Sequence, residues 1–498
     1  DDHADWGEAR LEVKAGAPLP ALLEPERAPT VVLTPKPPAQ PRLNGPAVYG
    51  AGAGRPFLYR IPATGERPLE FDAEGLPAGL SLDRRTGIIT GVVYDRGTFE
   101  VMLRARNRHG TAEKRFRIII GKGLALTPPL GWNSRNVRGC AVDDAKIRRA
   151  ADALVATGLA DHGWAYVNID DCWMRRPGPD ARDPNTGEIL PNEKFPDMRA
   201  LTDYVHARGL KLGIYTGPNE STCQGFVASK GYERADLRAF ARWGVDYIKV
   251  DWCSANRDPV AQQQAYRWFG DLLKEVERDI VYSLCQYGWH RVWEWGAGVG
   301  GNLWCTAGEI EDTWGSIATT GFQQDEMAPF AAPGHWNDPD RLVVGLLGRD
   351  SEVRPSRLTP DEQYTHLSLW ALLAAPLLIG ADLTQLDEFT LGLLTNDEVL
   401  AVNQDERGIQ GKRVARLEGG DVYAKPLADG SHAVGLFNRD WFEHELGVDW
   451  EQLGLSGPQR VRDLWRQQDL GVFDRRYAAR VPSHGVVLVS VAAAGEQD

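Results

Sequence analysis

The sequence predicts a multidomain protein with an N-terminal β-sandwich, a central (β/α)₈ TIM barrel and a C-terminal antiparallel β domain. Its 498 residues are enough for about three domains. Short β-type runs fill the first and last parts of the chain, whereas the middle alternates apolar runs with amphipathic stretches, as in parallel sheets covered by helices. With 43% hydrophobic and 25% charged residues, the composition is that of globular proteins.

The N-terminal part contains two predicted segments. Residues 1–27 are acidic and rich in Ala and Pro, which predicts an extended lead-in segment. Residues 28–122 contain short strands separated by turn residues, and Phe116, Ile118 and Ile120 alternate with polar positions as in a half-buried strand. The stretch GLPAGLSLDRRTGIITG resembles immunoglobulin-like modules of secreted bacterial enzymes. Such a module either binds carbohydrate or spaces the next domain, and we expect the spacing role.

Residues 123–410 predict the barrel. Short apolar runs, which we interpret as strands, are mostly followed by amphipathic stretches that we interpret as helices. This alternation extends over roughly 280 residues, the size of a (β/α)₈ barrel. The expected strands lie near 131, at 164–171, 210–215, 245–251 and 280–288, near 305, near 335 and at 375–380. In residues 411–498 the β pattern returns in DVYAKPL, HAVGLFN and HGVVLVSV, which predicts the closing antiparallel domain.

Charge and cysteine content limit the function classes. A net charge of −13 argues against nucleic acid or an anionic membrane as a partner, and no apolar run reaches the 18 residues of a membrane span. The 17 Trp, 53 Gly and 31 Pro fit a sugar-handling protein. The six Cys lack the paired spacing of a zinc site, so they are either scattered thiols or disulfides of an oxidising compartment. Together with a chain that opens on Asp1, this predicts a secreted or periplasmic protein whose signal peptide has been removed.

Polar residues gather at the carboxyl ends of the expected strands, where barrel enzymes build their active sites. Buried acids at such positions are costly unless they bind something or accept hydrogen bonds. The residues in question are Asp170, Asp171, Tyr215, Asp251, Gln286, Asp338 and Asp340.

The strings GWN, NIDDCW, KLGIY, YIKVDWC, SLCQYG, GHWNDPD and AAPLLIG, in this order, resemble glycoside hydrolase family 27, the α-galactosidases and α-N-acetylgalactosaminidases. The resemblance covers about residues 124–495. It implies a barrel followed by an antiparallel β domain, an oligosaccharide or polysaccharide substrate, and retaining hydrolysis through a glycosyl-enzyme intermediate. It also implies that no metal and no organic cofactor is needed.

The same resemblance assigns roles to individual residues. Asp251 is the expected nucleophile, and Lys249, two residues earlier on the same strand, shares its face. Asp170 and Asp171 are expected to accept hydrogen bonds from sugar hydroxyls if their strand ends there. The other expected sugar-binding residues of the matching motifs are Tyr215, Gln286 and Asp340. The family's disulfides fall on Cys140 with Cys172 and on Cys223 with Cys253.

Four positions depart from the family pattern. WCTAGEIEDTW places Glu309 at the acid/base position, usually Asp, and Cys305 where a sugar-binding Arg is expected. Arg135 stands where relatives carry a Trp, and Arg341 where they usually carry Met. Because Arg recognises carboxylate, sulfate and phosphate, the pocket is a candidate for a uronic acid or sulfated sugar.

Alternatives remain open from the sequence. The arginines, with Arg138, either recognise such an anion or pair with local acids and leave an ordinary α-galactosidase. Specificity for β-L-arabinopyranoside or α-N-acetylgalactosaminide, or a non-catalytic carbohydrate-binding relative, are further possibilities. Cys285 and Cys305 either form a third disulfide or stay as thiols. Asp312 is the second candidate for the acid/base, although we expect it to be structural.

Overall fold

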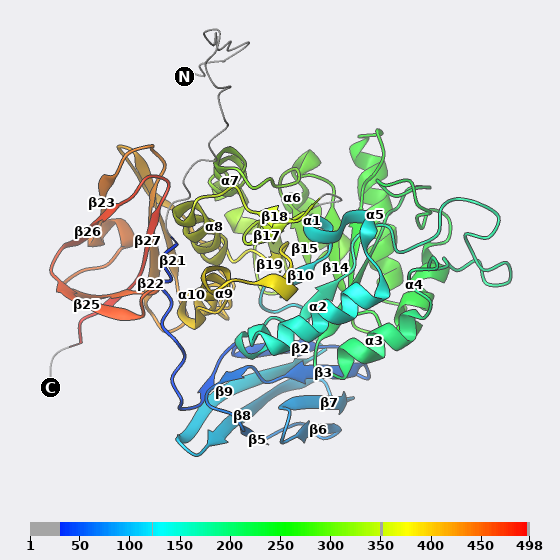
Figure 1. Cartoon of the computed structure of the whole chain (residues 1–498), viewed down its shortest axis with the longest axis horizontal. Coiled ribbons are helices and arrows are strands. Elements are labelled where there is room, and N and C mark those ends of the chain that lie inside the picture. The colour runs from blue at the N-terminus through cyan, green and yellow to red at the C-terminus, as the bar shows by residue number, and fades with distance from the viewer. Residues whose placement is uncertain (1–29, 122, 349–351, 496–498) are drawn as a thin grey trace, which may run out of the picture.

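The structure is a computed structural model that describes residues 30–121, 123–348 and 352–495. Three bodies lie against one another (Figure 1): a central barrel, a β-sandwich below it and a C-terminal β domain on its left. The predicted fold class is therefore confirmed. The lead-in predicted for residues 1–27 falls outside the described residues.

The sandwich consists of a four-stranded sheet in the order β2-β9-β8-β5 against a three-stranded sheet in the order β3-β7-β6, with the pair β1-β4 beside them. Phe116, Ile118 and Ile120 of β9 are buried in its core, so the predicted alternation is confirmed. The strands are β1 (Arg42–Leu43), β2 (Val48–Ala51), β3 (Pro56–Arg60), β4 (Ala63–Thr64), β5 (Glu70–Glu74), β6 (Leu80–Asp83), β7 (Ile88–Val92), β8 (Gly97–Asn107) and β9 (Gly110–Ile120).

Eight parallel strands form the barrel, in the order β16-β15-β14-β13-β12-β11-β10-β19. A parallel bridge between Leu342, just after β16, and Ile379 of β19 joins the two ends of this sheet. All eight predicted strands are thus present. They are β10 (Leu130–Asn133), β11 (Tyr166–Asn168), β12 (Lys211–Thr216), β13 (Tyr247–Asp251), β14 (Val281–Cys285), β15 (Leu303–Cys305), β16 (Trp336–Asp338) and β19 (Leu377–Ile379).

Helices follow the strands and cover the barrel (Figure 1). Several begin at an Asp whose side chain accepts a first-turn N–H, as at Asp143, Asp197 and Asp258. Within the described ranges, no helix is long and apolar enough to reach across a lipid bilayer. The helices are α1 (Arg135–Arg138), α2 (Asp144–Ala156), α3 (Met198–His206), α4 (Glu233–Trp243), α5 (Pro259–Leu273), α6 (Val292–Trp295), α7 (Trp314–Gly321), α8 (Pro360–Leu372), α9 (Glu388–Leu394) and α10 (Asp397–Asn403).

The C-terminal domain packs on α8, which is buried from Glu362 to Leu372 because it has protein on both sides. Trp465 donates its indole N–H to Ser368 of this helix at 2.8 Å. Its main sheet has the antiparallel order β20-β21-β22-β27-β24-β25, and β23 pairs with β26. The strands are β20 (Lys412–Leu417), β21 (Gly420–Pro426), β22 (His432–Asn438), β23 (His444–Asp449), β24 (Gln459–Asp463), β25 (Gln468–Phe473), β26 (Arg476–Val481) and β27 (Val486–Ala493), and a small pair, β17 (Leu346–Leu347) with β18 (Arg354–Pro355), lies in the barrel region.

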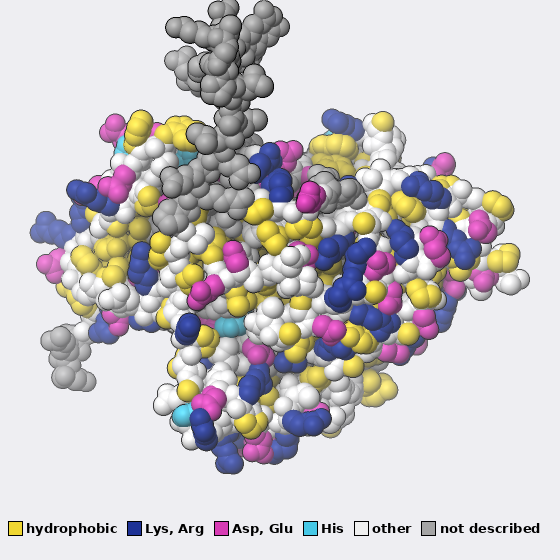
Figure 2. Space-filling model, viewed as in Figure 1, with side chains coloured by type: hydrophobic (Ala, Val, Ile, Leu, Met, Phe, Trp, Pro, Cys, Tyr) yellow, Lys and Arg dark blue, Asp and Glu magenta, His cyan; other side chains and the backbone are white. Residues whose placement is uncertain are grey.

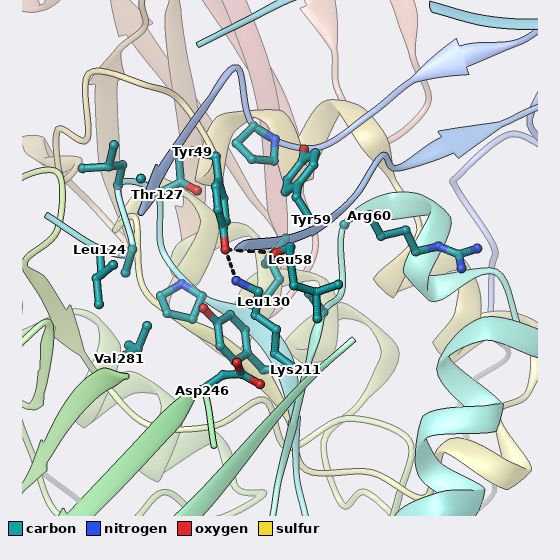
Figure 3. Close-up of a pocket in the computed structure, with 18 of the residues that line it drawn as sticks. Tyr49, Leu58, Tyr59, Arg60, Leu124, Thr127, Leu130, Lys211, Asp246 and Val281 are labelled. Atoms are coloured by element: carbon teal, nitrogen blue, oxygen red, sulfur yellow. Dashed lines mark hydrogen bonds between the residues drawn. The ribbon is translucent and has the colours of Figure 1, made fainter. Parts of the chain in front are cut away.

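The sandwich covers the face of the barrel at which the strands begin. Asp161 accepts hydrogen bonds from Arg60 at 3.1 Å and from Arg67 at 2.6 Å. Tyr49 contacts Lys211, the first residue of β12, at the edge of a cavity of about 100 Å³ between the two bodies (Figure 3). The sandwich is thus docked on the side of the barrel opposite the carboxyl ends of the strands.

We expect Asp161→Ala to lower the free energy of unfolding by about 1 kcal/mol, because the partly buried Arg60 and the exposed Arg67 lose their shared carboxylate. Calorimetry and limited proteolysis between the sandwich and the barrel measure the loss. Asp72→Ala is the matched control, since Asp72 pairs with Arg84 on the exposed surface of the same sandwich. Equal stability of the two variants would mean that Asp161 does not hold the sandwich in place.

Candidate active site

The predicted site residues meet at the carboxyl ends of the barrel strands. Asp251 is the last residue of β13, and Lys249 of the same strand is in register with Tyr215 of β12. β11 ends at Asn168, so Asp170 and Asp171 lie beyond the strand. The remaining predicted residues follow β10, β14, β15 and β16: Arg135, Gln286, Cys305 at the end of β15, Glu309, Asp340 and Arg341.

Two tyrosines hold the carboxylate of Asp251. Tyr215 donates its hydroxyl to Oδ2 at 2.9 Å, and Tyr287 donates its hydroxyl to Oδ1 at 3.1 Å. Burial raises the pKa of Asp251, while the charge of Lys249 and the bonds from the tyrosines oppose that rise. Sequence reasoning missed Tyr287, although it lies next to Gln286 in the recognised string. Its positive φ of 66° turns the chain at this point.

Lys249 donates to Asp170 at 3.1 Å, not to Asp251, and its ammonium lies over the Tyr215 ring, 5.3 Å from the centroid. Asn133 also donates to the same oxygen of Asp170, at 3.0 Å. Burial alone would raise the pKa of Asp170, but the charges of Lys249 and Arg341 outweigh it and hold this pKa below its ordinary value. Asp170 is therefore ionised and lies close to positively charged side chains.

Asp171 and the two disulfides shape the neighbouring loops. Its carboxylate accepts from the backbone N–H of Cys172 at 2.7 Å and of Gln224 at 3.0 Å, and burial raises its pKa to about 6. The structure contains both disulfides expected from the resemblance, Cys140–Cys172 and Cys223–Cys253. The first anchors the chain just after Asp171, and the second ties the loop that carries Gln224 to the end of β13. The backbone N–H of Gln224 could not be inferred from the sequence pattern.

Arg341 lies between three acidic side chains of the pocket. Its side chain is only 4% exposed, and its Nε lies 3.0 Å from Oδ1 of Asp340. Its two terminal nitrogens lie 3.9 Å from Asp170 and 3.9 Å from Glu309. Glu309 stands on the loop between β15 and α7, with 30% of its side chain exposed. The guanidinium thus lies among three carboxylates.

The other arginines also have acidic neighbours. Arg138 donates to Asp382 at 2.9 Å. Arg135 is buried, and its charge contributes to lowering the pKa of Asp170. Arg138 and Arg341 therefore lie against local acids, as in the second of the two interpretations drawn from the sequence.

Asp312 is saturated by two arginines. Arg354 donates to both of its oxygens, at 2.7 and 3.1 Å, and Arg357 donates to Oδ1 through its side chain at 3.0 Å and to Oδ2 through its backbone at 2.8 Å. A carboxylate with all its acceptor positions occupied cannot readily exchange a proton with a substrate. This arrangement fits the structural role that we expected.

The end of β14 carries two features of the pocket. Cys285 and Cys305 end the neighbouring strands β14 and β15 as buried free thiols, so no third disulfide is present at this pair. Gln286 is fully buried, and within the described residues neither its Nε2 nor its Oε1 has a hydrogen-bond partner. A buried amide without partners is costly, which makes Gln286 a candidate for binding a ligand.

One cluster resembles a metal site by its atoms alone. Cys223, Asp251 and Cys253 place their ligand atoms within 4.8 Å of one another. The two sulfurs, however, are joined in a disulfide and supply no thiolate. The chemistry of this donor set therefore does not fit a metal ion.

A (β/α)₈ barrel that gathers carboxyl groups at the carboxyl ends of its strands is one on which glycoside hydrolases are built. Three family models match the chain: "Alpha galactosidase A" at residues 127–405, "Alpha galactosidase C-terminal beta sandwich domain" at 418–491 and "Putative Ig domain" at 40–121. The chain belongs to the α-galactosidase family, glycoside hydrolase family 27.

Individual relatives agree with this assignment. The alpha-galactosidase of Cyamopsis tetragonoloba is 38% identical over 77% of this chain and 91% of its own length. A Bacteroides fragilis crystal structure described as a "putative alpha-galactosidase/melibiase" is 37% identical, with a TM-score of 0.86 over 93% of this chain and 99% of its own. Alpha-galactosidase I of Mortierella vinacea is 31% identical, with a TM-score of 0.69 over 76% of this chain and 99% of its own. The protein is thus an α-galactosidase-like glycoside hydrolase.

Proposed function

We propose that the protein is a retaining exo-glycosidase that removes terminal α-galactosyl residues from neutral oligosaccharides or polysaccharides. The observation that carries this proposal is the carboxylate of Asp251, fixed by Tyr215 and Tyr287 at the centre of the strand ends. Glu309, linked to the same group of side chains through Arg341, is the second carboxyl group that retention requires.

In the first step, a carboxylate oxygen of Asp251 attacks the anomeric carbon from the face opposite the glycosidic bond. Glu309 gives its proton to the leaving oxygen, and the sugar becomes a β-galactosyl ester of Asp251. In the second step, Glu309 takes a proton from water, which displaces Asp251 and releases α-galactose. Both residues then return to their starting protonation states.

The surrounding residues bind and orient the sugar. Asp170 and Asp171 accept hydrogen bonds from its hydroxyls, and Lys249 keeps Asp170 ionised. Gln286, whose amide has no partner among the described residues, is free to bond a ring hydroxyl with either end of the amide.

The charges of the pocket favour a neutral sugar. Arg341 is surrounded by Asp170, Glu309 and Asp340, so its positive charge is already balanced. Asp170 and Asp340, whose pKa values are held below their ordinary range, and the ionised nucleophile Asp251 would repel the added negative charge of a uronic acid or a sulfated sugar. The family's neutral substrate is therefore favoured over the anionic one.

A panel of aryl glycosides tests the proposal: α-galactoside, α-N-acetylgalactosaminide, β-L-arabinopyranoside, α-galacturonide and a sulfated α-galactoside. We expect the α-galactoside to be the best substrate, with α-galactose as the first product in an NMR time course. β-Galactose as the first product would exclude retention. Preference for either acidic glycoside, lost in Arg341→Met, would reinstate anion recognition.

The two disulfides support an oxidising location, secreted or periplasmic, because such bonds persist outside reducing compartments. Each restrains a loop beside the site. The chemistry proposed for Asp251 and Glu309 requires neither a metal ion nor an organic cofactor.

Tyr287→Phe should shift the acid limb of the pH profile of kcat/KM to higher pH. The Tyr287 hydroxyl stabilises ionised Asp251, so its loss raises the pKa of Asp251 further and leaves less of the nucleophile ionised at acid pH. Steady-state kinetics across the acid range measure the shift. Tyr204→Phe is the control, because that hydroxyl donates to Asp152 on an outer helix. An acid limb at the same pH in Tyr287→Phe and in the parent would show that this hydrogen bond does not lower the pKa of Asp251.

A further inference from the structure

Two adjacent aromatic side chains project into solvent from the C-terminal domain. Trp441 is 72% exposed and Phe442 is 73% exposed, on the loop that joins β22 to β23. Hydrophobic side chains are visible at the surface of the upper end of this domain in Figure 2. Exposed aromatic pairs leave apolar area in water, and they are typical of surfaces that bind a ligand.

The loop that carries the pair is held by hydrogen bonds at its base. Asn438 donates to the backbone oxygen of Phe442 at 2.6 Å and to that of Val481 at 2.9 Å. Asp440 accepts from the backbone N–H of Trp441 at 2.7 Å, and Ser483 donates to the backbone oxygen of Asp440 at 3.1 Å. The backbone below the two rings is therefore ordered before any ligand binds, which reduces the entropy cost of binding.

Contacts through His484 place this loop at the rim of the active site. The His484 ring contacts Trp441, with centroids 4.4 Å apart, and stacks on Trp314 at 4.0 Å. Its Nδ1 bonds to Glu362 at 2.7 Å. Trp314 is the first residue of α7, and Glu362 lies in the first turn of α8. Because barrel helices begin where the preceding strands end, both contacts are on the face that carries the site.

The loop is also near the proposed acid/base. Glu309 precedes Trp314 by five residues, and five residues reach at most about 18 Å. From Trp314, two ring contacts lead to Trp441. A glycan that leaves the pocket beside Glu309 therefore needs only a few sugar units to reach Trp441 and Phe442.

We propose that Trp441 and Phe442 form a platform for the glycan chain that carries the terminal galactosyl residue. Here "platform" means these two side chains. The inference rests on the proposed function, since it concerns the part of the substrate beyond the cleaved bond. The apolar faces of pyranose rings stack on exposed indole and phenyl rings, and such contacts need no charge, which suits a neutral polysaccharide.

A second copy of the chain is a less suitable occupant. Two aromatic side chains offer about 300–500 Å² when fully covered. A stable dimer interface needs about 800 Å² from each partner. Arg439 and Glu443 flank the platform and are exposed, so the apolar area does not continue beyond it along the loop.

Paired kinetics on a short and a long substrate test the platform. In the double variant Trp441→Ala/Phe442→Ala, we expect kcat/KM for an aryl α-galactoside to stay within twofold of the parent. For an α-galactosyl-branched polysaccharide we expect about a tenfold loss, mainly in KM. Tyr94→Ala is the matched control, since Tyr94 is 77% exposed on the sandwich at the other side of the barrel. Phe442→Ser is the second variant, for the case in which loss of the Trp441–His484 contact unfolds the loop.

The outcomes separate the two proposals. Equal losses on both substrates, or no loss on either, would overturn the platform. A parent that is dimeric by analytical ultracentrifugation and a variant that is monomeric would also overturn it, in favour of a second copy. If no galactoside is hydrolysed, the proposed function fails. Polysaccharide binding by Asp251→Asn, with and without the platform substitutions, then tests the platform alone, and tighter binding with it intact supports the proposal.

Discussion

Asp251→Asn should lower kcat for an aryl α-galactoside by about 10⁴-fold or more, because an amide cannot form the glycosyl ester. The change keeps the size of the side chain and an oxygen that can accept from Tyr215 or Tyr287. Binding of galactose should therefore persist while turnover is lost. Steady-state kinetics and calorimetric titration with galactose measure the two quantities separately.

Asp338→Asn is the matched control for that loss. Asp338 ends β16 in the same site, and its Oδ1 accepts from the backbone N–H of Asp340, a role that an amide oxygen can fill. Burial already raises the pKa of Asp338 to about 7, so this carboxyl is not held as an anion as Asp170 is. Turnover should survive this substitution. If both Asn variants were equally inactive, the loss would reflect the pocket as a whole and not the nucleophile.

An azide rescue identifies the attacking face. In Asp251→Ala, azide can enter the vacated space and attack the anomeric carbon of an activated α-galactoside. The product should be β-galactosyl azide, because attack occurs opposite the leaving group. Formation of the α-azide would place the nucleophile elsewhere.

Much of the barrel could be predicted because its strands are short apolar runs that end in polar residues. Asp251 and Asp170 lie at such ends, so their gathering at one face follows from the parallel sheet alone. The partners of these residues could not be predicted in the same way. Lys249 shares a face with Asp251 in the strand, yet its ammonium reaches Asp170, because it lies over the ring of Tyr215 on β12, the strand between β13 and β11.

The departures from the family pattern show the same limit. The sequence left open whether Arg341 binds a ligand or pairs with acids. The spacing of residues along the chain does not tell how the loops after β11, β15 and β16 are placed relative to one another. The answer depends on Asp340, whose turn with a positive φ of 79° brings the next side chain inward between Asp170 and Glu309. Similarly, spacing could not decide between a bridge and free thiols at Cys285 and Cys305, which are found as thiols.

Glu309→Gln should reduce kcat/KM for an oligosaccharide by about 10²–10⁴-fold, because the leaving sugar oxygen needs a proton. An activated aryl group leaves without that help, so the first step on a dinitrophenyl α-galactoside should be almost unchanged. The glycosyl-enzyme should then accumulate, since the amide of this variant cannot take a proton from water, and a burst of dinitrophenol should precede slow turnover. Stopped-flow absorbance measures the burst.

Asp312→Asn completes this test as the matched control. Asp312 follows Glu309 by three residues in the same loop, but Arg354 and Arg357 occupy its oxygens. Its substitution should affect stability without any dependence on the leaving group. If instead Asp312→Asn showed the burst and Glu309→Gln did not, the acid/base would be Asp312. Such a result would require the two arginines to release Asp312 when substrate binds, because a carboxylate held by both cannot deliver a proton.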